Sequence, residues 1–357
     1  MPWLLENGKR YSFNEIKNGV AESSSAIIFC SDWLNEKEKF VLQTSGSTGA
    51  PKRIEVTRYQ LKASARITAE YLNLKPEETA LVCLDVAFVA GLMMLVRAME
   101  TGMNIIVTPP QANPLQSVAH LQIDFTALVP YQVETILNSP QHEKLHKIRN
   151  VLIGGAPLSE QTRTALQSFT NGMFATYGMT ETLTHIALQK INSTTENTFQ
   201  VLPGFEIETD ERGCLVVTAA HLGPEAVITN DLIERVSKNQ FRWLGRIDSV
   251  INTGGVKIIP EKVEPLIAKV FEKLKITNRF FIAGLPHAQL GESVALIIEA
   301  ALSAEKTDLV MRELEQNLSR YENPKSIYQL GQFAYTQSGK INRPQTIEIL
   351  KFNISNS

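Results

Sequence analysis

The sequence predicts an α/β protein with a large first domain and a smaller second domain. Three observations predict it. From about Arg53 to Phe169, short apolar runs typical of strands alternate with segments of helical periodicity, which favours a largely parallel sheet. From about Phe199 to Trp243, the pattern changes to short strands separated by turns, which indicates a small β-rich part. The length of 357 residues is about twice that of a typical domain.

The elements of the first domain can be placed in order. Thr57 is expected to cap a helix that ends near Asn73, because apolar residues recur there at helical spacing. Strands are expected at 80–84, 104–107, 125–129 and 151–153, and helices at 91–100, 131–137 and 160–169. Nearer the N-terminus, we expect a strand at 26–29 and a helix after Asp32. From Pro260 onward, helical and strand-like runs mix, which indicates an α+β second domain.

Composition and charge exclude several classes of protein. A net charge of −2 gives no electrostatic reason to expect nucleic acid or an anionic membrane as a partner. Cys30, Cys83 and Cys214 have no paired spacing, which suits a reducing compartment and indicates neither disulfides nor a zinc site. No apolar run approaches the roughly 20 residues of a membrane span, and the first residues lack the pattern of a secretion signal. We therefore expect a cytoplasmic protein.

A loop rich in glycine and hydroxyl residues lies between two expected strands, Phe40-Val41-Leu42 and Arg53-Ile54-Glu55-Val56. Its polar and glycine residues are Thr44, Ser45, Gly46, Ser47, Thr48, Gly49 and Lys52. Glycines let successive backbone N–H groups point at one anion, hydroxyls add donors, and the lysine adds positive charge. The loop is therefore expected to bind phosphate, although it differs from the P-loop pattern because its lysine follows Pro51. A flexible linker is the alternative.

A second short motif has no functional meaning on our interpretation. His142-Glu143-Lys144-Leu145-His146 matches H-E-x-x-H, which on a helix places two imidazoles on one face for zinc. Only about two helical turns fit between Pro140 and the strand that starts near Asn150. No third ligand is indicated nearby. We therefore interpret this segment as a solvated surface helix.

Four further motifs follow the glycine-rich loop along the chain. They lie at 151–158, 176–182, 228–231 and 245–260, and a fifth, Tyr335-Thr336-Gln337-Ser338-Gly339-Lys340-Ile341, lies near the C-terminus. Together with the loop, these segments resemble the signatures of the adenylate-forming superfamily, which includes acyl-CoA ligases, luciferases and peptide-synthetase adenylation domains. The resemblance covers nearly the whole chain, from Thr44 to Lys340. It implies the adenylate-forming enzyme fold.

The resemblance assigns nucleotide-binding roles to individual residues. It implies that Tyr177 lies against the adenine, that Thr180 contacts the α-phosphate, and that Glu181 helps to hold Mg²⁺, a cation that prefers carboxylate and phosphate oxygens. Asp231 is expected to accept hydrogen bonds from the ribose hydroxyls, and Arg246 to bind the ribose. The other positions expected near ATP and AMP are Gly154, Gly155, Ala156, Thr176, Gly178 and Met179.

The resemblance also implies two domains that move relative to each other. Residues 1–247 are expected to bind ATP and the acid, with the β-rich part at about 199–247, and residues 248–357 to form a mobile C-terminal domain. Asp248 matches the hinge, and Lys340 matches the catalytic lysine. The Gly254-Gly255 segment is expected to approach the reactive centre, where coenzyme A (CoA) enters.

Three departures from the family pattern concern single residues. Asn230 replaces a usual glycine, and we expect asparagine's tolerance of positive φ to compensate. Cys214 stands where a glutamate is usual, and Ala334 stands where a proline is typical. None of them removes a group with an expected role in the chemistry.

The implied reaction has two steps. A carboxylate attacks the α-phosphate of ATP to give acyl-AMP and pyrophosphate, and a thiol then displaces AMP. Family position indicates an acyl pocket formed by Phe88, Val89, Gly91, Val129, Leu183 and His185. Many relatives carry a histidine within the segment 87–91, which has none here. We expect His185 either to face a second substrate carboxylate or to be bonded to the backbone of a strand.

Only 43 residues precede the loop, whereas relatives usually carry a long N-terminal subdomain there. A truncated ligase of this layout most resembles the o-succinylbenzoate–CoA ligases of menaquinone synthesis. The expected anchors of the short N-terminal arm are Trp3, Leu4, Leu5, Tyr11, Phe13 and Trp33. We expect the surface that this arm leaves uncovered to support a homodimer.

Three alternatives to this function remain open. The enzyme could load a carrier protein instead of CoA, since both acceptors use the double-glycine segment. It could also be a ligase for another aromatic acid. A regulator that binds nucleotide without catalysis is the third, and the presence of Lys340, Glu181 and the whole loop argues against it.

The lysine motif generates the first prediction. Lys340→Ala should lower adenylation by several orders of magnitude, because it removes positive charge where negative charge develops. Thioester formation from preformed acyl-AMP should stay largely intact, because the rotated domain carries the lysine away in that step. Each half-reaction is measured separately. Equal losses in both would contradict the alternation of domains.

Overall fold

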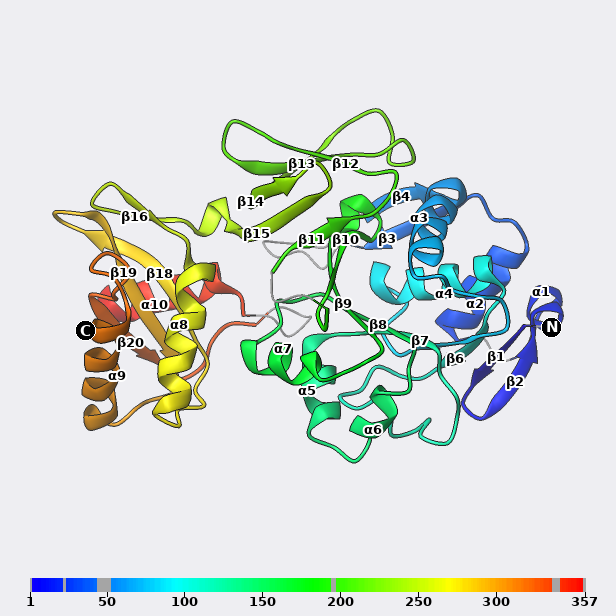
Figure 1. Cartoon of the computed structure of the whole chain (residues 1–357), viewed down its shortest axis with the longest axis horizontal. Helices are drawn as coiled ribbons and strands as arrows, with labels where there is room; N and C mark the ends of the chain where they lie inside the picture. Colours follow the sequence, from blue (N-terminus) through cyan, green and yellow to red (C-terminus); the bar gives the residue numbers. More distant parts are fainter. Residues whose placement is uncertain (1, 22–23, 44–52, 194–196, 336–340, 356–357) are drawn as a thin grey trace.

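The computed structural model describes residues 2–21, 24–43, 53–193, 197–335 and 341–355 (Figure 1). Two sheets organise them. A 13-stranded sheet lies in the first two thirds of the chain, and a 5-stranded sheet lies in the last third. Strands β3 (Lys39–Gln43) and β4 (Arg53–Thr57) form a separate antiparallel pair on either side of the glycine-rich loop. The described residues contain no helix that is long and apolar enough to cross a membrane.

The large sheet combines a parallel and an antiparallel half. Its strands, in spatial order, are β12 (Glu206–Thr209), β13 (Cys214–Thr218), β14 (Val227–Ser237), β15 (Gln240–Arg246), β11 (Phe199–Val201), β10 (His185–Lys190), β9 (Gly172–Gly178), β8 (Asn150–Ile153), β7 (Phe125–Leu128), β5 (Thr79–Val82), β6 (Asn104–Val107), β1 (Trp3–Glu6) and β2 (Lys9–Ser12). The run from β9 to β1 is parallel, and the pairs outside it are antiparallel. The expected β-rich part therefore extends the central sheet.

Helices cover both faces of the parallel half. They are α1 (Phe13–Asn18), α2 (Ser25–Leu34), α3 (Arg58–Tyr71), α4 (Val89–Thr101), α5 (Pro130–Leu137), α6 (His142–Leu145) and α7 (Glu160–Gln167). Alternate residues of β5 point to opposite faces, as the pleat requires. Ala80 and Val82 join the core under α2, α3 and α4, and Leu81 joins the core under α5, α6 and α7. This layering confirms the predicted α/β class.

Most of the predicted elements are present, and two predictions near the N-terminus are wrong. The helix expected after Asp32 does not form, because α2 ends at Leu34 and strand β3 begins at Lys39. Thr57 caps α3, where its side chain accepts a hydrogen bond from the Gln60 backbone N–H. Residues 26–29, predicted as a strand, lie within helix α2. The Ser24 side chain caps this helix by accepting from Ile27 N–H, and the buried residues recur at helical spacing up to Trp33. A four-residue apolar run fits either element, and here the cap and the tertiary contacts decide.

The N-terminal arm completes the sheet. Strand β1 pairs in parallel with β6, and β2 then forms the outer edge. Of the six predicted anchors, Leu4, Tyr11 and Trp33 are buried in the first core. Trp3, Leu5 and Phe13 are partly buried and pack against the two cores. The arm therefore contributes side chains to both cores.

The last third of the chain has its own sheet and cores. Its strands are β16 (Ile251–Thr253), β17 (Val256–Ile258), β18 (Phe280–His287), β19 (Gly291–Glu299) and β20 (Ser326–Leu330), and its helices are α8 (Pro260–Lys273), α9 (Ala304–Asn317) and α10 (Arg343–Ser355). Its two hydrophobic cores contain only residues from this part of the chain. The short helix η2 (Ile247–Ser249) connects it to β15 (Figure 1).

The burial of the arm generates a stability prediction. Leu4 in β1 is 0% exposed, so Leu4→Ala should lower the free energy of unfolding by about 2–5 kcal/mol. Leu309→Ala in α9 is the control, since that side chain is 37% exposed and should lose well under half as much. Urea denaturation of both variants checks it. Equal losses would show that the arm contributes little to the core.

Candidate active site

Glycines bring the ends of three neighbouring strands into close contact. A Cβ on Gly154, just after β8, would lie 2.2 Å from Thr176 Oγ1. A Cβ on Gly178, at the end of β9, would lie 2.3 Å from the carbonyl oxygen of Thr184. Such approaches exclude any larger residue. The predicted residues 154 and 176–178 therefore meet at the carboxyl end of the parallel strands, where open α/β sheets bind ligands.

Tyr177 and Asp231 are in direct contact, although 54 positions separate them in the sequence. The Tyr177 hydroxyl donates to Asp231 Oδ2 at 2.6 Å. Burial, and then the neighbouring Asp231 carboxylate, raise the pKa of Tyr177, so the phenol remains a donor. Its ring packs edge-on against Phe199 and Phe241, at 5.8 and 5.2 Å between ring centroids. The structure thus joins two of the residues predicted to bind the nucleotide.

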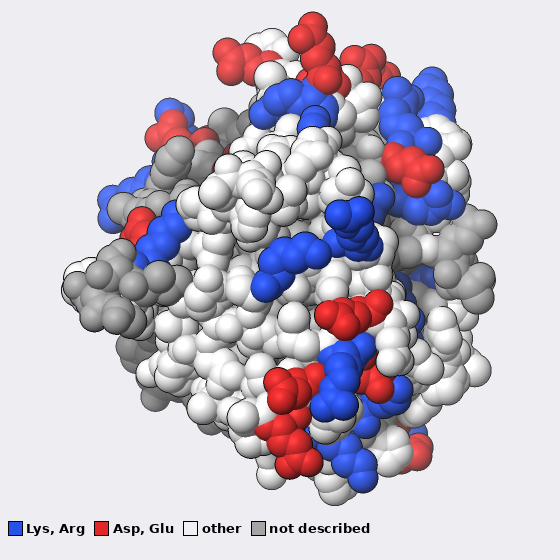
Figure 2. Space-filling view, turned by 90° about the vertical axis from the view of Figure 1, so that its left-hand side faces the viewer, with Lys and Arg blue, Asp and Glu red and all other residues white. Residues whose placement is uncertain are grey.

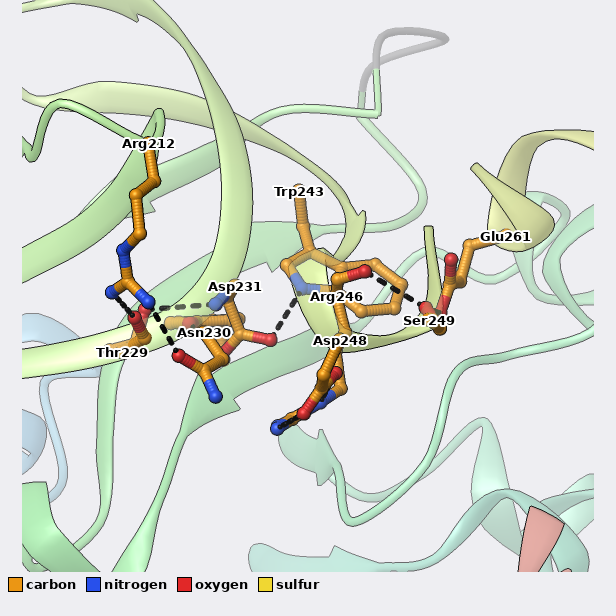
Figure 3. A network of polar contacts seen from close by, with 10 residues as sticks. Arg212, Thr229, Asn230, Asp231, Trp243, Arg246, Asp248, Ser249 and Glu261 are labelled. Carbon is orange, nitrogen blue, oxygen red and sulfur yellow. Dashed lines mark hydrogen bonds and ion pairs between the residues drawn. The ribbon is translucent and has the colours of Figure 1, made fainter. Parts of the chain in front are cut away.

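The segment that carries Asp231 is held by hydrogen bonds on both sides (Figure 3). Thr229 Oγ1 accepts from the Asp231 N–H at 3.1 Å and donates to the carbonyl of Leu215 at 2.8 Å. Arg212 donates to the Asn230 side-chain oxygen at 3.1 Å. Asn230 lies within β14 and does not adopt a positive φ, so the expectation of a left-handed residue here was wrong. An extended strand accepts asparagine without strain.

Arg246 lies directly opposite Asp231 in the β14–β15 ladder. Its guanidinium makes a bidentate pair with Asp248, in which Nε donates to Oδ1 at 2.9 Å and Nη2 donates to Oδ2 at 2.6 Å (Figure 3). The hydrogen bonds from Arg246 hold the pKa of Asp248 below its ordinary value. Just beyond, Ser249 donates to Glu261 of α8 at 3.0 Å. Arg246, expected to bind the ribose, and Asp248, the expected hinge residue, therefore form an ion pair with each other in this arrangement.

Thr180 and Glu181 lie in the short helix η1 (Thr180–Thr182), with Met179 as its N-cap. Glu181 is exposed, and no group of three or more metal-binding side chains occurs among the residues that the structure describes. One exposed carboxylate fits an Mg²⁺ ion that takes its other ligands from phosphate and water. The next residue, Leu183, is buried with a φ of +64°, an uncommon conformation for a bulky residue and one that clusters at functional sites.

A buried polar cluster lies beside the predicted acyl pocket. Arg97 of α4 is 2% exposed and donates to Thr184 Oγ1 at 2.6 Å. His185 is buried too, with Nδ1 at 3.3 Å from Thr184 Oγ1 and Nε2 at 3.0 Å from Thr68 Oγ1. Burial and then Arg97 lower the pKa of His185 well below its ordinary value, so the imidazole is neutral. His185 is thus bonded to side chains, whereas one expectation was a bond to the backbone.

Among the described residues, the hydrogen-bond partner of Arg97 is the Thr184 hydroxyl and not a carboxylate, and its Nε atom is buried without a hydrogen-bond partner. Burial lowers the pKa of Arg97 to about 9, which still leaves it charged at neutral pH. A buried cation without a counter-ion is costly. An anion bound beside Arg97 would therefore compensate its positive charge.

The other predicted residues are placed as follows. Phe88 and Val89 begin α4, which also carries Gly91 and Arg97, and Val129 precedes α5 close to Gly155. Gly254 and Gly255 form the exposed turn between β16 and β17, which Figure 1 shows apart from β9. The predicted residues Thr44, Ser45, Gly46, Ser47, Thr48, Gly49, Lys52 and Lys340 lie outside the described residues.

Two polar contacts were not predicted from the sequence. The Trp243 indole donates to Asp231 Oδ1 at 3.1 Å, and Arg97 binds Thr184 as described. A signal for Arg97 does exist, because it is a lone charge inside the apolar run from Leu92 to Ala98, where a solvated residue is not expected. No local signal marks Trp243. Its contact depends on strand register.

Comparison with known proteins defines the class. Residues 32–216, just over half of the chain, match the family described as AMP-binding enzyme. The chain therefore belongs to the AMP-binding enzyme family and is an ATP-dependent, AMP-forming acid–thiol ligase.

Three individual proteins are similar to this chain over most of its length. An acyl-CoA synthetase (AMP-forming)/AMP-acid ligase II-like protein from Dyadobacter fermentans DSM 18053 is 42% identical, with 95% of this chain and 99% of that chain covered and a TM-score of 0.64. The 2-succinylbenzoate–CoA ligase of Lactococcus lactis subsp. lactis (strain IL1403) is 24% identical, with 94% of this chain and 75% of that protein covered. O-succinylbenzoate coenzyme A synthetase from Bacillus subtilis, in complex with ATP and magnesium ion, shares the fold at 20% identity, with coverage of 86% and 69% and a TM-score of 0.73.

The neutral state of His185 generates a pH prediction. The unfolded chain binds a proton at this histidine near its ordinary pKa of 6.5, whereas the folded chain resists protonation. Stability is therefore retained above about pH 6.5 and falls as the pH drops below it, at about 1.4 kcal/mol per pH unit for one proton.

Urea denaturation of wild type and His185→Gln at pH 7.5 and pH 5.5 checks this prediction. The variant should be less stable at pH 7.5 and should lose less stability on acidification than wild type. His221→Gln controls for the second histidine whose pKa burial lowers. Identical pH dependence in wild type and His185→Gln would contradict a buried neutral imidazole.

Proposed function

We propose that the chain is a carboxylate–CoA ligase whose acid is o-succinylbenzoate, an aromatic keto-dicarboxylate of menaquinone biosynthesis. Curated relatives named 2-succinylbenzoate–CoA ligase support this substrate, although they are only 23–25% identical over 94–96% of the chain. The chemistry of the buried cluster provides the second, independent support.

The substrate proposal depends on the buried, unpaired charge of Arg97. The substrate has two carboxylates, of which one reacts with ATP and the other needs a partner. Arg97 is a buried cation with a free N–H, and it binds Thr184 between the predicted pocket residues Leu183 and His185. A guanidinium binds carboxylates in a planar, charge-assisted geometry. The unreacted carboxylate would supply the missing counter-charge.

The nucleotide half of the site follows from the residues at the strand ends. Tyr177 would lie against the adenine, Asp231 would accept from the ribose, and Arg246 would exchange its pair with Asp248 for the ribose. Thr180 would hold the α-phosphate, and Glu181 would hold Mg²⁺. When bound, that ion supplies positive charge to the phosphates. The predicted phosphate loop, between β3 and β4, would bind the β- and γ-phosphates.

The second half of the reaction requires the C-terminal part to move. We place the domain boundary between residues 247 and 248, where η2 connects two units that have separate cores. Asp248 would act as the hinge. Lys340 would serve adenylation in one orientation, and Gly254-Gly255 would line the entry of CoA in the other. Closure of this domain would protect the acyl-AMP from water.

Two further expectations about the chain remain proposals. We propose a homodimer, supported by the exposed apolar residues Ile28 and Val41, which lie on α2 and β3 within the N-terminal arm. We also place the enzyme in the cytoplasm, because its three cysteines are free and buried.

The role of Arg97 generates a prediction about substrate choice. Wild type should act on o-succinylbenzoate at least about 100-fold better, in kcat/KM, than on benzoate or a medium-chain fatty acid, a gap of about 2.7 kcal/mol. Arg97→Met removes the charge and keeps the length of the side chain, so it should erase most of this preference. Pyrophosphate release from a panel of acids, with and without CoA, measures it.

The control is Arg66→Met, which removes an exposed guanidinium from α3, the helix that neighbours α4. It should leave the preference between acids unchanged. If Arg97→Met kept the full preference, or if fatty acids reacted as fast as o-succinylbenzoate in wild type, the substrate proposal would be rejected.

A further inference from the structure

The carboxylate of Asp231 is held at both oxygens by aromatic donors. The Tyr177 hydroxyl donates to Oδ2 at 2.6 Å. The Trp243 indole N–H donates to Oδ1 at 3.1 Å (Figure 3). Arg246, opposite Asp231 in the ladder, is bound to Asp248. The orientation of the carboxylate therefore depends on the two aromatic residues.

A β-bulge brings Trp243 to this position. Leu232 pairs with Gly245, but the next residue, Ile233, pairs with Trp243, so β15 contains one extra residue at Leu244. Side chains alternate between the faces of a strand, and an extra residue reverses that alternation beyond it. Arg246 lies opposite Asp231 and shares its face. In a regular strand, Leu244 would lie on the same face as Asp231. The bulge places Trp243 on that face instead.

We propose that Trp243 is a positioning residue that sets the preference of this enzyme for ribonucleotides. This inference rests on the proposed nucleotide site. A carboxylate has about four acceptor positions, two on each oxygen. One donor on each oxygen leaves one acceptor on each, which matches the two neighbouring hydroxyls of a ribose. Tyr177 and Trp243 thus fix the carboxylate in the plane that both hydroxyls need.

The loss of the indole N–H should affect the ribose selectively. In Trp243→Phe, one Asp231 oxygen loses its donor and the carboxylate can rotate. The dissociation constant of AMP should rise about tenfold, equivalent to about 1.4 kcal/mol, which lies near the lower end of the range for a hydrogen bond to a charged group. The dissociation constant of 2′-deoxy-AMP should change less than about twofold, because that ligand offers only one hydroxyl.

A second variant restores the donor. The Nε2 atom of histidine is separated from Cβ by the same number of bonds as the indole Nε1 of tryptophan. Trp243→His should therefore recover much of the preference for AMP over 2′-deoxy-AMP. Trp3→Phe, in the N-terminal strand β1, is the matched control and should match wild type. If Trp243→Phe does not fold, Trp243→Leu supplies the same comparison.

Calorimetric titration of the purified chain with AMP and 2′-deoxy-AMP, which requires no acid and no turnover, tests the inference. A preference for AMP that falls in Trp243→Phe and returns in Trp243→His supports it. An unchanged preference in Trp243→Phe overturns it and leaves the proposed function standing. Equal weakening of both nucleotides also overturns it, since that indicates a structural role alone. If wild type binds neither nucleotide, the inference and the proposed function fail together.

Discussion

The hydrogen bond between Tyr177 and Asp231 places a strong constraint on the shape of the large sheet. Tyr177 is the penultimate residue of β9 and Asp231 lies on β14, and three strands separate these two strands in spatial order. In a flat sheet these strands would be about 19 Å apart. A bond of 2.6 Å therefore requires the antiparallel half to bend toward the ends of the parallel strands. This bend brings the expected adenine and ribose contacts into one site.

Much of this arrangement could be predicted from the sequence. The alternation of strands and helices gave the α/β class, and Tyr177, Asp231 and Arg246 were recognised because their segments match family signatures. Residues 26–29 were misassigned, because a short apolar run is compatible with a strand or with one face of a helix. Trp243 could not be found, since its contact depends on an extra residue in β15 that only the pairing of two strands reveals.

The two halves of the site differ in their electrostatics. Around Asp231 the partners are neutral aromatic donors, and the neighbouring Arg246 is neutralised by Asp248. Around His185 the imidazole is neutral, and Arg97 is the one buried cation described in that cluster. The Arg97 side chain is enclosed by protein, where an unpaired charge costs free energy, and an anionic group of the acid would lower that cost. By contrast, the lysine, arginine, aspartate and glutamate side chains visible in Figure 2, which shows the side of the C-terminal part, are on the surface. Substrate choice and nucleotide choice would then depend on different residues.

The central claim is that one chain forms an acyl-AMP and then transfers the acyl group to CoA. Pyrophosphate and AMP can be measured in one experiment with enzyme, ATP and o-succinylbenzoate, before and after CoA is added. We expect about one equivalent of pyrophosphate per chain before CoA, with little free AMP, and continuous release of both products after it. Release of ADP, or continuous turnover that CoA does not change, would contradict the claim.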